Sequence, residues 1–340
     1  MSELAVLAGS DEGLFIMRSN DEGKSWKSPE RAPLPEVEVA AIRRAPDGAV
    51  YVGTRGNGLF RSRDGLRHWE QVDTPPALHK LRSLAIDAER FLAGNEAGPG
   101  PVAIFEWEAG QQWRQLGDLA QCSGASAWFY PVETEGVHIR HLARDPHKPE
   151  RLYAAVQVGG VAVSADGGES WTDRRNLDCD VHMVEADPNR PGVLYAGSGG
   201  GGLYKSADYG DTWECISEGC GQFVVQFAMD PRDTQRLYLG TARGGVRAWR
   251  TDPAGARGEM WRSEDGGASW HKLRGGLPEF MRSRVNAVYV DPEEPDHVFF
   301  SGGHTKGEPD SGVHFSPDGG ETWRSIAPID EVIVLSSVRL

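Results

Sequence analysis

One eight-residue phrase recurs along the chain and always ends in tryptophan. Residues 164–171 read Ser-Ala-Asp-Gly-Gly-Glu-Ser-Trp, and close copies occupy residues 19–26, 206–213, 263–270 and 316–323. The copy at 62–69 loses its second glycine, and the copy at 106–113 keeps little more than an acidic residue, one glycine and Trp113. The tryptophans lie about forty to under sixty residues apart, and self-similarity at such a period is typical of stacked supersecondary units. The repeat therefore constrains the architecture of the whole chain.

Each repeat is predicted to contain four short strands. In the unit that ends at Trp213, strands are predicted over residues 181–186, 193–197 and 202–206, and the phrase turns the chain into a last strand at 212–214. An Asp-Pro turn separates the first two strands, because the aspartate bonds nearby amides while proline fixes φ. The same dipeptide begins at Asp145, Asp187, Asp230 and Asp291. Short strands with evenly spaced turns and one aromatic signature per unit predict a β-propeller.

The two ends of the chain complete this prediction. The chain begins with a strand of the second type at residues 4–8, and it ends with a lone strand at 331–336. Pairing of these two strands would close the ring and leave no exposed sheet edge. We therefore predict an all-β, seven-bladed β-propeller with four-stranded blades, closed by its N- and C-terminal strands, as a single domain over residues 1–340.

The repeated phrase also identifies a family resemblance. It is the Asp-box, and the chain resembles the BNR/Asp-box propellers over essentially its full length. That group includes sialidases, xyloglucanase-type glycosidases, sortilin ectodomains and photosystem II assembly factors. The resemblance implies the fold, but its members share a turn and not an active site. We interpret each box aspartate as structural, because its carboxylate can satisfy turn amides while glycine provides positive φ and tryptophan packs on the next sheet.

Composition excludes several function classes. The net charge of −14 argues against general nucleic-acid binding, which needs a cationic surface. The four cysteines show no CxxC spacing, so reduced thiols are expected. The first nine residues lack a basic segment and a long apolar core, and no stretch is apolar enough to span a membrane. We expect a cytoplasmic, monomeric protein with no membrane association and no cofactor.

Long connections mark the surface on which function is expected. Residues 116–137 carry Trp128, residues 242–258 carry Arg243, and residues 302–312 carry His304. All three belong to the connection types that should lie on the face opposite the box turns. Long loops on a rigid scaffold usually carry function. Trp128, Arg243 and His304 are therefore candidate ligand-binding residues.

The first strands of the repeats place ionisable residues at equivalent positions. Aligned on their turns, they share one apolar position, which should pack between blades. The residue before it is Glu38, Lys80, His138, Asp180, Phe223, Arg284 or Glu331. The residue after it is Ala40, Arg82, Arg140, His182, Val225, Asn286 or Ile333. These two columns predict two tiers of residues at the mouth of the axial channel, where desolvation makes unpaired charges costly.

The basic members of these tiers predict an anion site. Lys80, Arg82, His138, Arg140 and His182 come from three successive blades and form a cationic arc in an acidic chain. Arginine can grip a carboxylate or phosphate with two hydrogen bonds. Glu38, Glu331 and Arg284 should lie toward the other side, and Asn286 of the second tier is a further candidate ligand-binding residue. The alternative is a water-filled channel lined by mutually paired charges.

A hydrolase is the first function that these residues suggest. Resemblance to sialidases implies an arginine trio, which Arg82, Arg140 and Arg284 could imitate. The Arg-Ile-Pro signature of that family is absent and no Tyr–Glu pair can be placed, so the chain is not a typical sialidase. A xyloglucanase-type reaction needs two carboxylates with room for water. Asp180, Glu38 and Glu331 lie in one tier, and Asp180 with His182 is our candidate acid–base pair.

Two further functions stay open at this point. A non-catalytic binding or assembly scaffold, with a protein as partner, fits every feature of the sequence. A metal site could form from His138, His182 and His304, although the nearby lysine and arginines oppose a cation. His141 is out of register with His138 and is predicted to pack inside its blade. The interpretation we favour is binding of a small anionic or carbohydrate-like ligand at the axial mouth.

Overall fold

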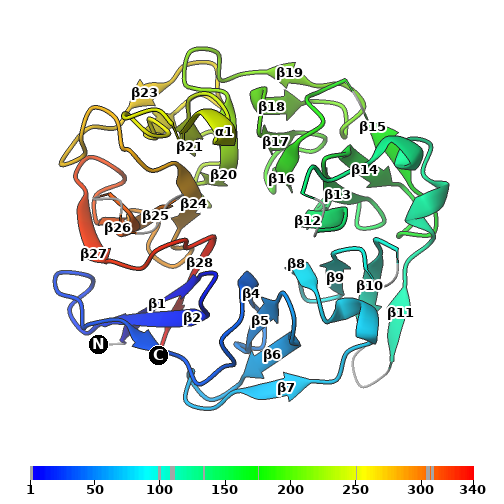
Figure 1. The fold of residues 1–340 in the computed structure, drawn as a ribbon, viewed down its shortest axis with the longest axis horizontal. Helices are drawn as coiled ribbons and strands as arrows, with labels where there is room; N and C mark the ends of the chain where they lie inside the picture. The colour runs from blue at the N-terminus through cyan, green and yellow to red at the C-terminus, as the bar shows by residue number, and fades with distance from the viewer. Residues whose placement is uncertain are drawn as a thin grey trace. The chain divides into compact units, whose positions relative to one another are not determined.

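Seven four-stranded antiparallel sheets make up the protein, which is a seven-bladed β-propeller as predicted. The computed structural model describes residues 3–98, 101–107, 112–132, 135–174, 176–249, 251–303, 307 and 310–340. The chain divides into two compact units, which we call the central unit (residues 40–215) and the terminal unit (residues 1–39 and 216–340). Figure 1 labels their strands. None of the helices among the described residues is long and apolar enough to cross a membrane.

The central unit contains four blades, each built from four strands that follow one another in sequence. Sequential hairpins are the expected result of short connections between antiparallel strands. The blades are β4 (Val39–Arg44), β5 (Val50–Thr54), β6 (Gly58–Ser62) and β7 (Glu70–Val72); β8 (Leu81–Ile86), β9 (Phe91–Asn95), β10 (Ile104–Trp107) and β11 (Trp113–Gln115); β12 (His138–Arg144), β13 (Leu152–Gln157), β14 (Gly160–Ser164) and β15 (Thr172–Arg174); and β16 (Val181–Ala186), β17 (Leu194–Ser198), β18 (Gly202–Ser206) and β19 (Glu214–Cys215).

The terminal unit contains three blades, one of which combines both ends of the chain. Strand β28 pairs antiparallel with β1, from Leu4 opposite Arg339 to Gly9 opposite Val334, as predicted. β28 begins at Val334, three residues later than the sequence suggested. The blades are β20 (Phe223–Met229), β21 (Leu237–Ala242), β22 (Glu259–Ser263) and β23 (His271–Lys272); β24 (Val285–Val290), β25 (Val298–Gly302), β26 (Gly312–Ser316) and β27 (Arg324–Ala327); and β28 (Val334–Arg339), β1 (Leu4–Gly9), β2 (Leu14–Ser19) and β3 (Glu30–Arg31).

The core of each unit lies between adjacent sheets. The second strand of every blade is buried along its whole length. Close approach of two sheets also requires glycine. A Cβ atom on Gly53 of β5 would lie 2.2 Å from Leu81 Cδ2 in the next blade. A larger residue at this position would push the two sheets apart.

The repeated turn uses its aspartate for backbone support. Asp166 Oδ1 accepts hydrogen bonds from Ser164 Oγ (2.7 Å) and the Ser170 amide (3.0 Å), and Oδ2 accepts from Ser170 Oγ (2.5 Å). These hydrogen bonds outweigh the effect of burial and lower the pKa of Asp166 to about 2. The other well-preserved copies make the same contacts through Asp21, Asp208, Asp265 and Asp318. Because these carboxylates already serve the turn, they are poor candidates for catalysis.

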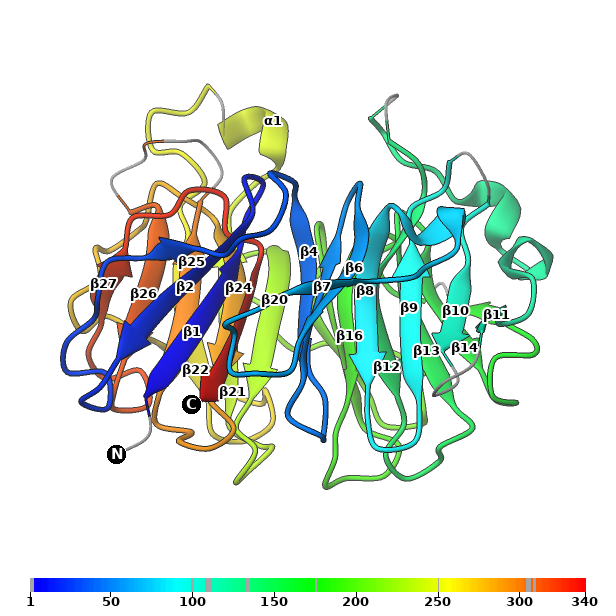
Figure 2. The ribbon, with the colours of Figure 1, turned by 90° about the horizontal axis from the view of Figure 1, so that it is seen from below.

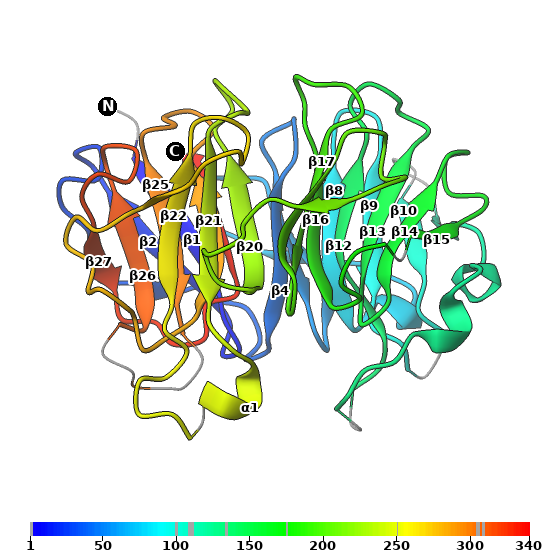
Figure 3. The ribbon, with the colours of Figure 1, turned by 90° about the horizontal axis from the view of Figure 1, so that it is seen from above.

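The long connections are attached to the ends of strands in each unit. In the central unit, the segment between β11 and β12 contains two short 3-10 helices (Leu119–Gln121 and Ala125–Ala127), and its Leu119 and Cys122 pack in one cluster with residues of β10, β13 and β14. Figure 2 shows these helices at the outer edge of the central unit in the view. In the terminal unit, the segment between β21 and β22 contains the helix α1 (Val246–Trp249), which projects beyond the end of β21 (Figure 3).

Candidate functional site

The first strands of the central unit carry most of the predicted site residues. In Figure 1, β4, β8, β12 and β16 lie along one side of this unit, and β12 contacts both β8 and β16. The pairing of three of these strands shifts by one residue near its start, at Arg82, Arg140 and His182. Such β-bulges leave the extra residue unpaired and redirect its side chain. The bulges therefore redirect the side chains of Arg82, Arg140 and His182, which belong to the second predicted tier.

Glu96, which directly follows β9, is the buried centre of one part of this site. It accepts hydrogen bonds from Arg55 Nε (2.6 Å) and Nη2 (3.1 Å) and from Lys80 Nζ (3.0 Å). Arg55 also lies 2.9 Å from Glu135. Burial alone would raise the pKa of Glu96, but the hydrogen bonds from Arg55 and Lys80 outweigh it and hold that pKa at about 2. Lys80, predicted to bind ligand, is thus already an ion-pair partner.

His138 is the centre of a second part and is fully buried. Its Nδ1 lies 3.0 Å from the Gly136 carbonyl. Its Nε2 lies 3.2 Å from Arg82 Nη2 and 2.9 Å from Gln157 Oε1, which also accepts from Arg140 Nη1 at 2.6 Å. Burial, reinforced by Arg82, lowers the pKa of His138 to about 3. The ring is therefore neutral at physiological pH, and it lies between the two arginines.

Asp180 and His182 are adjacent, as predicted. His182 Nε2 lies 3.2 Å from Asp180 Oδ1, yet this buried oxygen has no hydrogen bond of good geometry among the described residues. A Cβ atom on Gly199 would lie 2.1 Å from Asp180 Oδ2, so the carboxylate is confined between His182 and the backbone of Gly199. Burial alone would raise the pKa of Asp180, but His182 and Arg140 outweigh it and lower that pKa. Asp180 is therefore a charged acceptor and not a proton donor.

The remaining candidates on first strands belong to the terminal unit. Arg284 Nε donates to Asn286 Oδ1 (2.5 Å), and the guanidinium lies 5.9 Å from the centre of the Phe223 ring. Asn286 is buried, and its Nδ2 has no hydrogen-bond partner among the described residues. Glu331 has a positive φ of 50° just before β28, and Glu38 is half-buried just before β4. Arg284 and Asn286 are thus in contact in the structure.

Two of the three candidates on the long connections contact other parts of the protein. The Trp128 indole packs on the backbone of Gly159, where a Cβ atom would lie 2.8 Å from Trp128 Cδ1. Arg243 pairs with the buried Glu259 at 3.0 Å and lies 5.5 Å from the centre of the Phe280 ring. His304 lies outside the described residues. Trp128 and Arg243 are therefore engaged in packing and ion pairing.

Metal ligation has no support from the described part of the chain. Within it, no three His, Cys, Asp or Glu side chains gather closely enough to hold a metal ion. Both ring nitrogens of His138 contact protein atoms, and burial lowers its pKa together with Arg82 and Arg140. The same arginines would repel a bound cation.

A third cluster in the central unit was missed in the sequence. His141 Nε2 accepts from Arg43 Nη2 (3.0 Å), its Nδ1 donates to the Val184 carbonyl (3.0 Å), and Glu185 Oε1 lies 3.5 Å away. We expected His141 to pack inside its blade; it is buried, but its ring contacts two other first strands. Burial raises the pKa of Glu185 to about 7 and, with Arg43, lowers that of His141 to about 3.

The sequence did contain a signal for this cluster. Arg43 and Glu185 each follow the shared apolar position, Val39 or Val181, by four residues. Extending the column alignment by four residues would have found both of them. The bulge between Ile139 and His141 would still have hidden His141, because it changes the register of that strand.

The similarities between this chain and known proteins concern the fold. The sequence profile of the Sortilin-Vps10 family, described as sortilin, neurotensin receptor 3, matches residues 201–332, less than half of the chain. No curated protein matches the sequence. The GH74 enzyme of Niastella koreensis is similar in structure, with a TM-score of 0.64, 21% identity, and coverage of 84% of this chain and 44% of that one.

A second kind of structural neighbour has nearly the same length as this chain. YCF48 bound to D1 peptide gives a TM-score of 0.60 at 16% identity, covering 93% of this chain and 88% of that one. YCF48 from Cyanidioschyzon merolae gives a TM-score of 0.60 at 17% identity, with coverage of 92% and 95%. By contrast, the chain spans less than half of the Niastella enzyme and 38% of an ancestral GH74 enzyme. At these identities the similarity concerns the propeller fold alone.

Proposed function

We propose that this chain is a binding propeller of the BNR/Asp-box group that holds an anionic, carboxylate-bearing ligand on the first strands of its central unit. Arg82 and Arg140 are the proposed anchors, and Asp180 is an additional acceptor. The observation that carries the proposal is that Arg82 Nη2 lies 3.2 Å from His138 Nε2 and Arg140 Nη1 donates to Gln157 Oε1, so that both guanidinium groups contact neutral side chains. Neutral acceptors orient a guanidinium group without cancelling its charge.

Clustered positive charge at the site supports an anion. Glu96 is engaged by Arg55 and Lys80, and Asp180 lies against His182. Arg55, Lys80 and Arg82 lower the pKa of Glu96, and Arg140 helps to lower that of Asp180. Such a cluster of permanently positive side chains in a chain of net charge −14 attracts anions and orients them on approach.

The buried Oδ1 of Asp180 also bears on the class of ligand. It lies 3.2 Å from His182 Nε2 but accepts no hydrogen bond of good geometry among the described residues, so a ligand that supplies a well-aligned donor would be favoured there. The terminal residue of a peptide carries both a carboxylate, suited to Arg82 and Arg140, and an amide N–H, suited to Asp180. YCF48, a propeller of similar length, has been solved with a bound peptide. We therefore propose a peptide carboxyl terminus as the ligand class.

Binding of a carboxylate is tested with peptides that differ only in their C-terminal group, which is either a free carboxylate or a carboxamide. A library of acetylated pentapeptides with free carboxyl termini is titrated calorimetrically beside the same peptides carrying carboxamides. We expect Arg140→Ala to weaken binding of the free acids by ten- to a hundred-fold, because a hydrogen bond to a charged group contributes about 1.5–3 kcal/mol. The exposed Arg274 provides the matched control, Arg274→Ala. Equal binding of acids and amides, or full binding by Arg140→Ala, would overturn the proposal.

Hydrolysis is the second candidate, and one observation favours it. A glycosidase needs a carboxylic acid that keeps its proton at neutral pH. Asp180 and Glu96 do not meet this need because their pKa values are lowered, whereas the pKa of Glu185 is raised to about 7. Hydrolysis, if it occurs in the central unit, would therefore use Glu185 and not Asp180. Release of sugar from xyloglucan by wild-type protein, and its loss in Glu185→Gln, would establish this alternative.

A further inference from the structure

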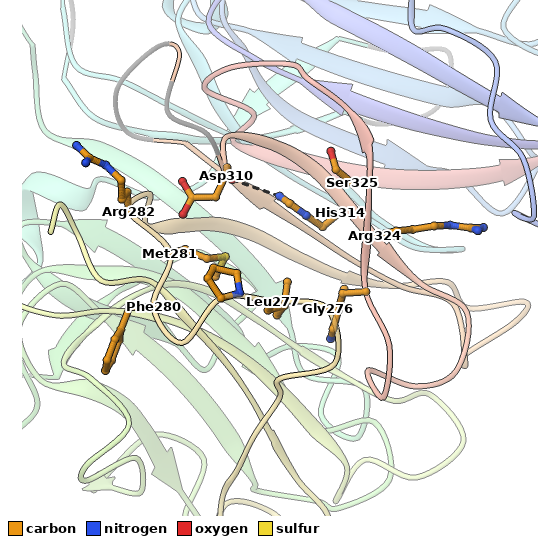
Figure 4. A pocket seen from close by; sticks show the side chains of 11 residues that line it. Gly276, Leu277, Phe280, Met281, Arg282, Asp310, His314, Arg324 and Ser325 are labelled. Carbon is orange, nitrogen blue, oxygen red and sulfur yellow. Dashed lines mark hydrogen bonds between the residues drawn. The ribbon is translucent and has the colours of Figure 1, made fainter.

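A cavity of about 420 Å³ opens in the terminal unit, and none of its lining residues belongs to the proposed peptide site. It lies between the segment that follows β23 and the outer strands β26 and β27 of the next blade (Figure 4). Leu277, Met281 and Trp323 provide apolar lining, and Asp310 and His314 provide polar groups. A volume of this size is typical of pockets that bind small molecules.

The walls of the cavity are fixed by backbone hydrogen bonds. The Trp323 amide donates to the Gly275 carbonyl (2.7 Å), and Met281 exchanges two hydrogen bonds with Gly258 (2.8 and 3.0 Å). The Trp323 indole N–H donates to the Gly320 carbonyl (2.9 Å) and so is not offered to the cavity. Met281 and Trp323 are almost fully buried. The cavity is therefore preformed, which reduces the entropy that a ligand loses on binding.

Asp310 offers a charged acceptor at the edge of this apolar lining. Its Oδ1 accepts hydrogen bonds from the Ser283 amide (3.1 Å) and from Ser283 Oγ (2.9 Å), which fix the carboxylate in place. Its Oδ2 accepts no hydrogen bond from any described residue. Figure 4 shows the Asp310 carboxylate between Arg282 and His314 in the view. One fixed oxygen of a charged group thus remains able to accept a donor.

His314 adds acceptor character to the same wall. Its Nε2 lies 3.2 Å from the Asp310 carbonyl, and because a carbonyl only accepts, this nitrogen carries the proton. Burial lowers the pKa of His314, so the ring is neutral and its Nδ1 is an acceptor. The ring is held by stacking on Phe300, with ring centroids 4.5 Å apart. A neutral, fixed imidazole does not repel a cationic ligand.

The cations near the cavity are directed elsewhere. Arg324 donates to the Gly23 carbonyl and lies 5.5 Å from the centre of the Phe315 ring. Arg282 is exposed, and in Figure 4 its guanidinium extends away from Leu277 and His314. A bound amine would therefore meet Asp310 first.

We propose that this cavity binds a small molecule that combines an apolar, aromatic body with a protonated primary amine. The body packs against Leu277, Met281 and Trp323, and the ammonium donates to Asp310 Oδ2. A fixed carboxylate beside preformed apolar walls selects such a ligand by charge as well as by shape. The ligand carries the opposite charge to that proposed for the central unit, so the two sites are chemically distinct.

Three probes of nearly equal size test the charge that the site selects. Phenethylamine, 2-phenylethanol and 3-phenylpropanoate share an aromatic body and differ in their polar end, and their binding is followed by ligand-observed NMR and calorimetry. We expect phenethylamine to bind wild-type protein at least ten-fold more tightly than 2-phenylethanol, and 3-phenylpropanoate to bind most weakly. Equal affinities, tighter binding of the acid, or no binding of phenethylamine at millimolar concentration would overturn the proposal.

Variants separate the carboxylate from the apolar walls. Asp310→Asn keeps an oxygen for Ser283 but removes the charge, and we expect it to abolish the preference for the amine over the alcohol. Asp47, which likewise accepts a backbone amide, from Ala49 at 3.0 Å, gives the control Asp47→Asn, which should keep the preference. Leu277→Ala should weaken the amine and the alcohol equally. A preference that survives in folded Asp310→Asn, judged by an unchanged circular dichroism spectrum, would contradict the assignment.

Discussion

Two buried glutamates, one in each unit, have nearly the same local environment. Glu96 in the central unit is 0% exposed and Glu259 in the terminal unit is 2% exposed. Each accepts hydrogen bonds from one arginine and one lysine: Arg55 and Lys80 for Glu96, and Arg243 and Lys272 for Glu259. In both units, paired charges and hydrogen bonds make a buried carboxylate tolerable.

The surroundings of these two clusters differ. Beside Glu96, Arg82 and Arg140 extend from β-bulges toward neutral acceptors. Beside Glu259, the lysine ammonium lies 4.0 Å from the centre of the Phe280 ring, next to an apolar cavity. The comparison teaches that such an ion pair is structural in itself. The side chains that the neighbouring strand or loop places beside the ion pair decide which class of ligand the region can bind.

Removal of either glutamate tests whether its ion pairs stabilise the fold. Of the predicted effects on stability, this one should be the largest. Glu96→Ala and Glu259→Ala each leave an arginine and a lysine without their buried partner, so each should lower the free energy of unfolding by about 3–5 kcal/mol. Urea unfolding followed by tryptophan fluorescence measures the loss. Glu70, exposed and paired with Arg61, is the control, and Glu70→Ala should cost less than about 1 kcal/mol. A loss below 1 kcal/mol for Glu96→Ala would show that its ion pairs are dispensable.

The acid sensitivity of Glu96 should be the next largest effect. Its pKa is about 2 in the folded protein against 4.5 ordinarily, so folding favours the charged form. The resulting stability is present above about pH 4.5 and disappears as the pH falls toward 2, and it amounts to about 3 kcal/mol. Unfolding of wild-type protein and Glu96→Gln is compared between pH 5 and 2. The difference between them should shrink as the pH falls, and a constant difference would contradict the lowered pKa.

Glu185 provides a contrast to Glu96. Its effect on stability should change with pH in the opposite direction, and it should be smaller. Its pKa is raised to about 7, so folding disfavours the charged form, and stability is lost as the pH rises from about 4.5 through 7. Glu185→Gln should therefore stabilise the protein at pH 8 by about 1 kcal/mol, a value reduced because a third of the side chain is exposed. Thermal unfolding at pH 5 and pH 8 measures this. The exposed Glu214 gives the control Glu214→Gln, which should show no such gain.

Prediction from the sequence was accurate where the repeat itself carried the information. The spacing of the tryptophan phrase gave the seven blades, and the order of strand types gave the pairing of β1 with β28. The column alignment correctly grouped Arg82 with His138 and Asp180 with His182, because equivalent strands bring equivalent positions together. It could not show that Lys80 is engaged by Glu96, since that glutamate follows the second strand of its blade and belongs to no column.

The amino-acid sequence by itself determined the blades, because a periodic pattern of turns and apolar strands leaves few ways to bury the sheets. Only the tertiary structure decided which charged groups are paired, which ionisable groups are neutral and which oxygen atoms can still accept a hydrogen bond. Those properties depend on contacts within a few ångströms between segments distant in the chain, as between Arg43 and His141. They depend also on single-residue bulges that change the direction of a side chain without any regular trace in the sequence.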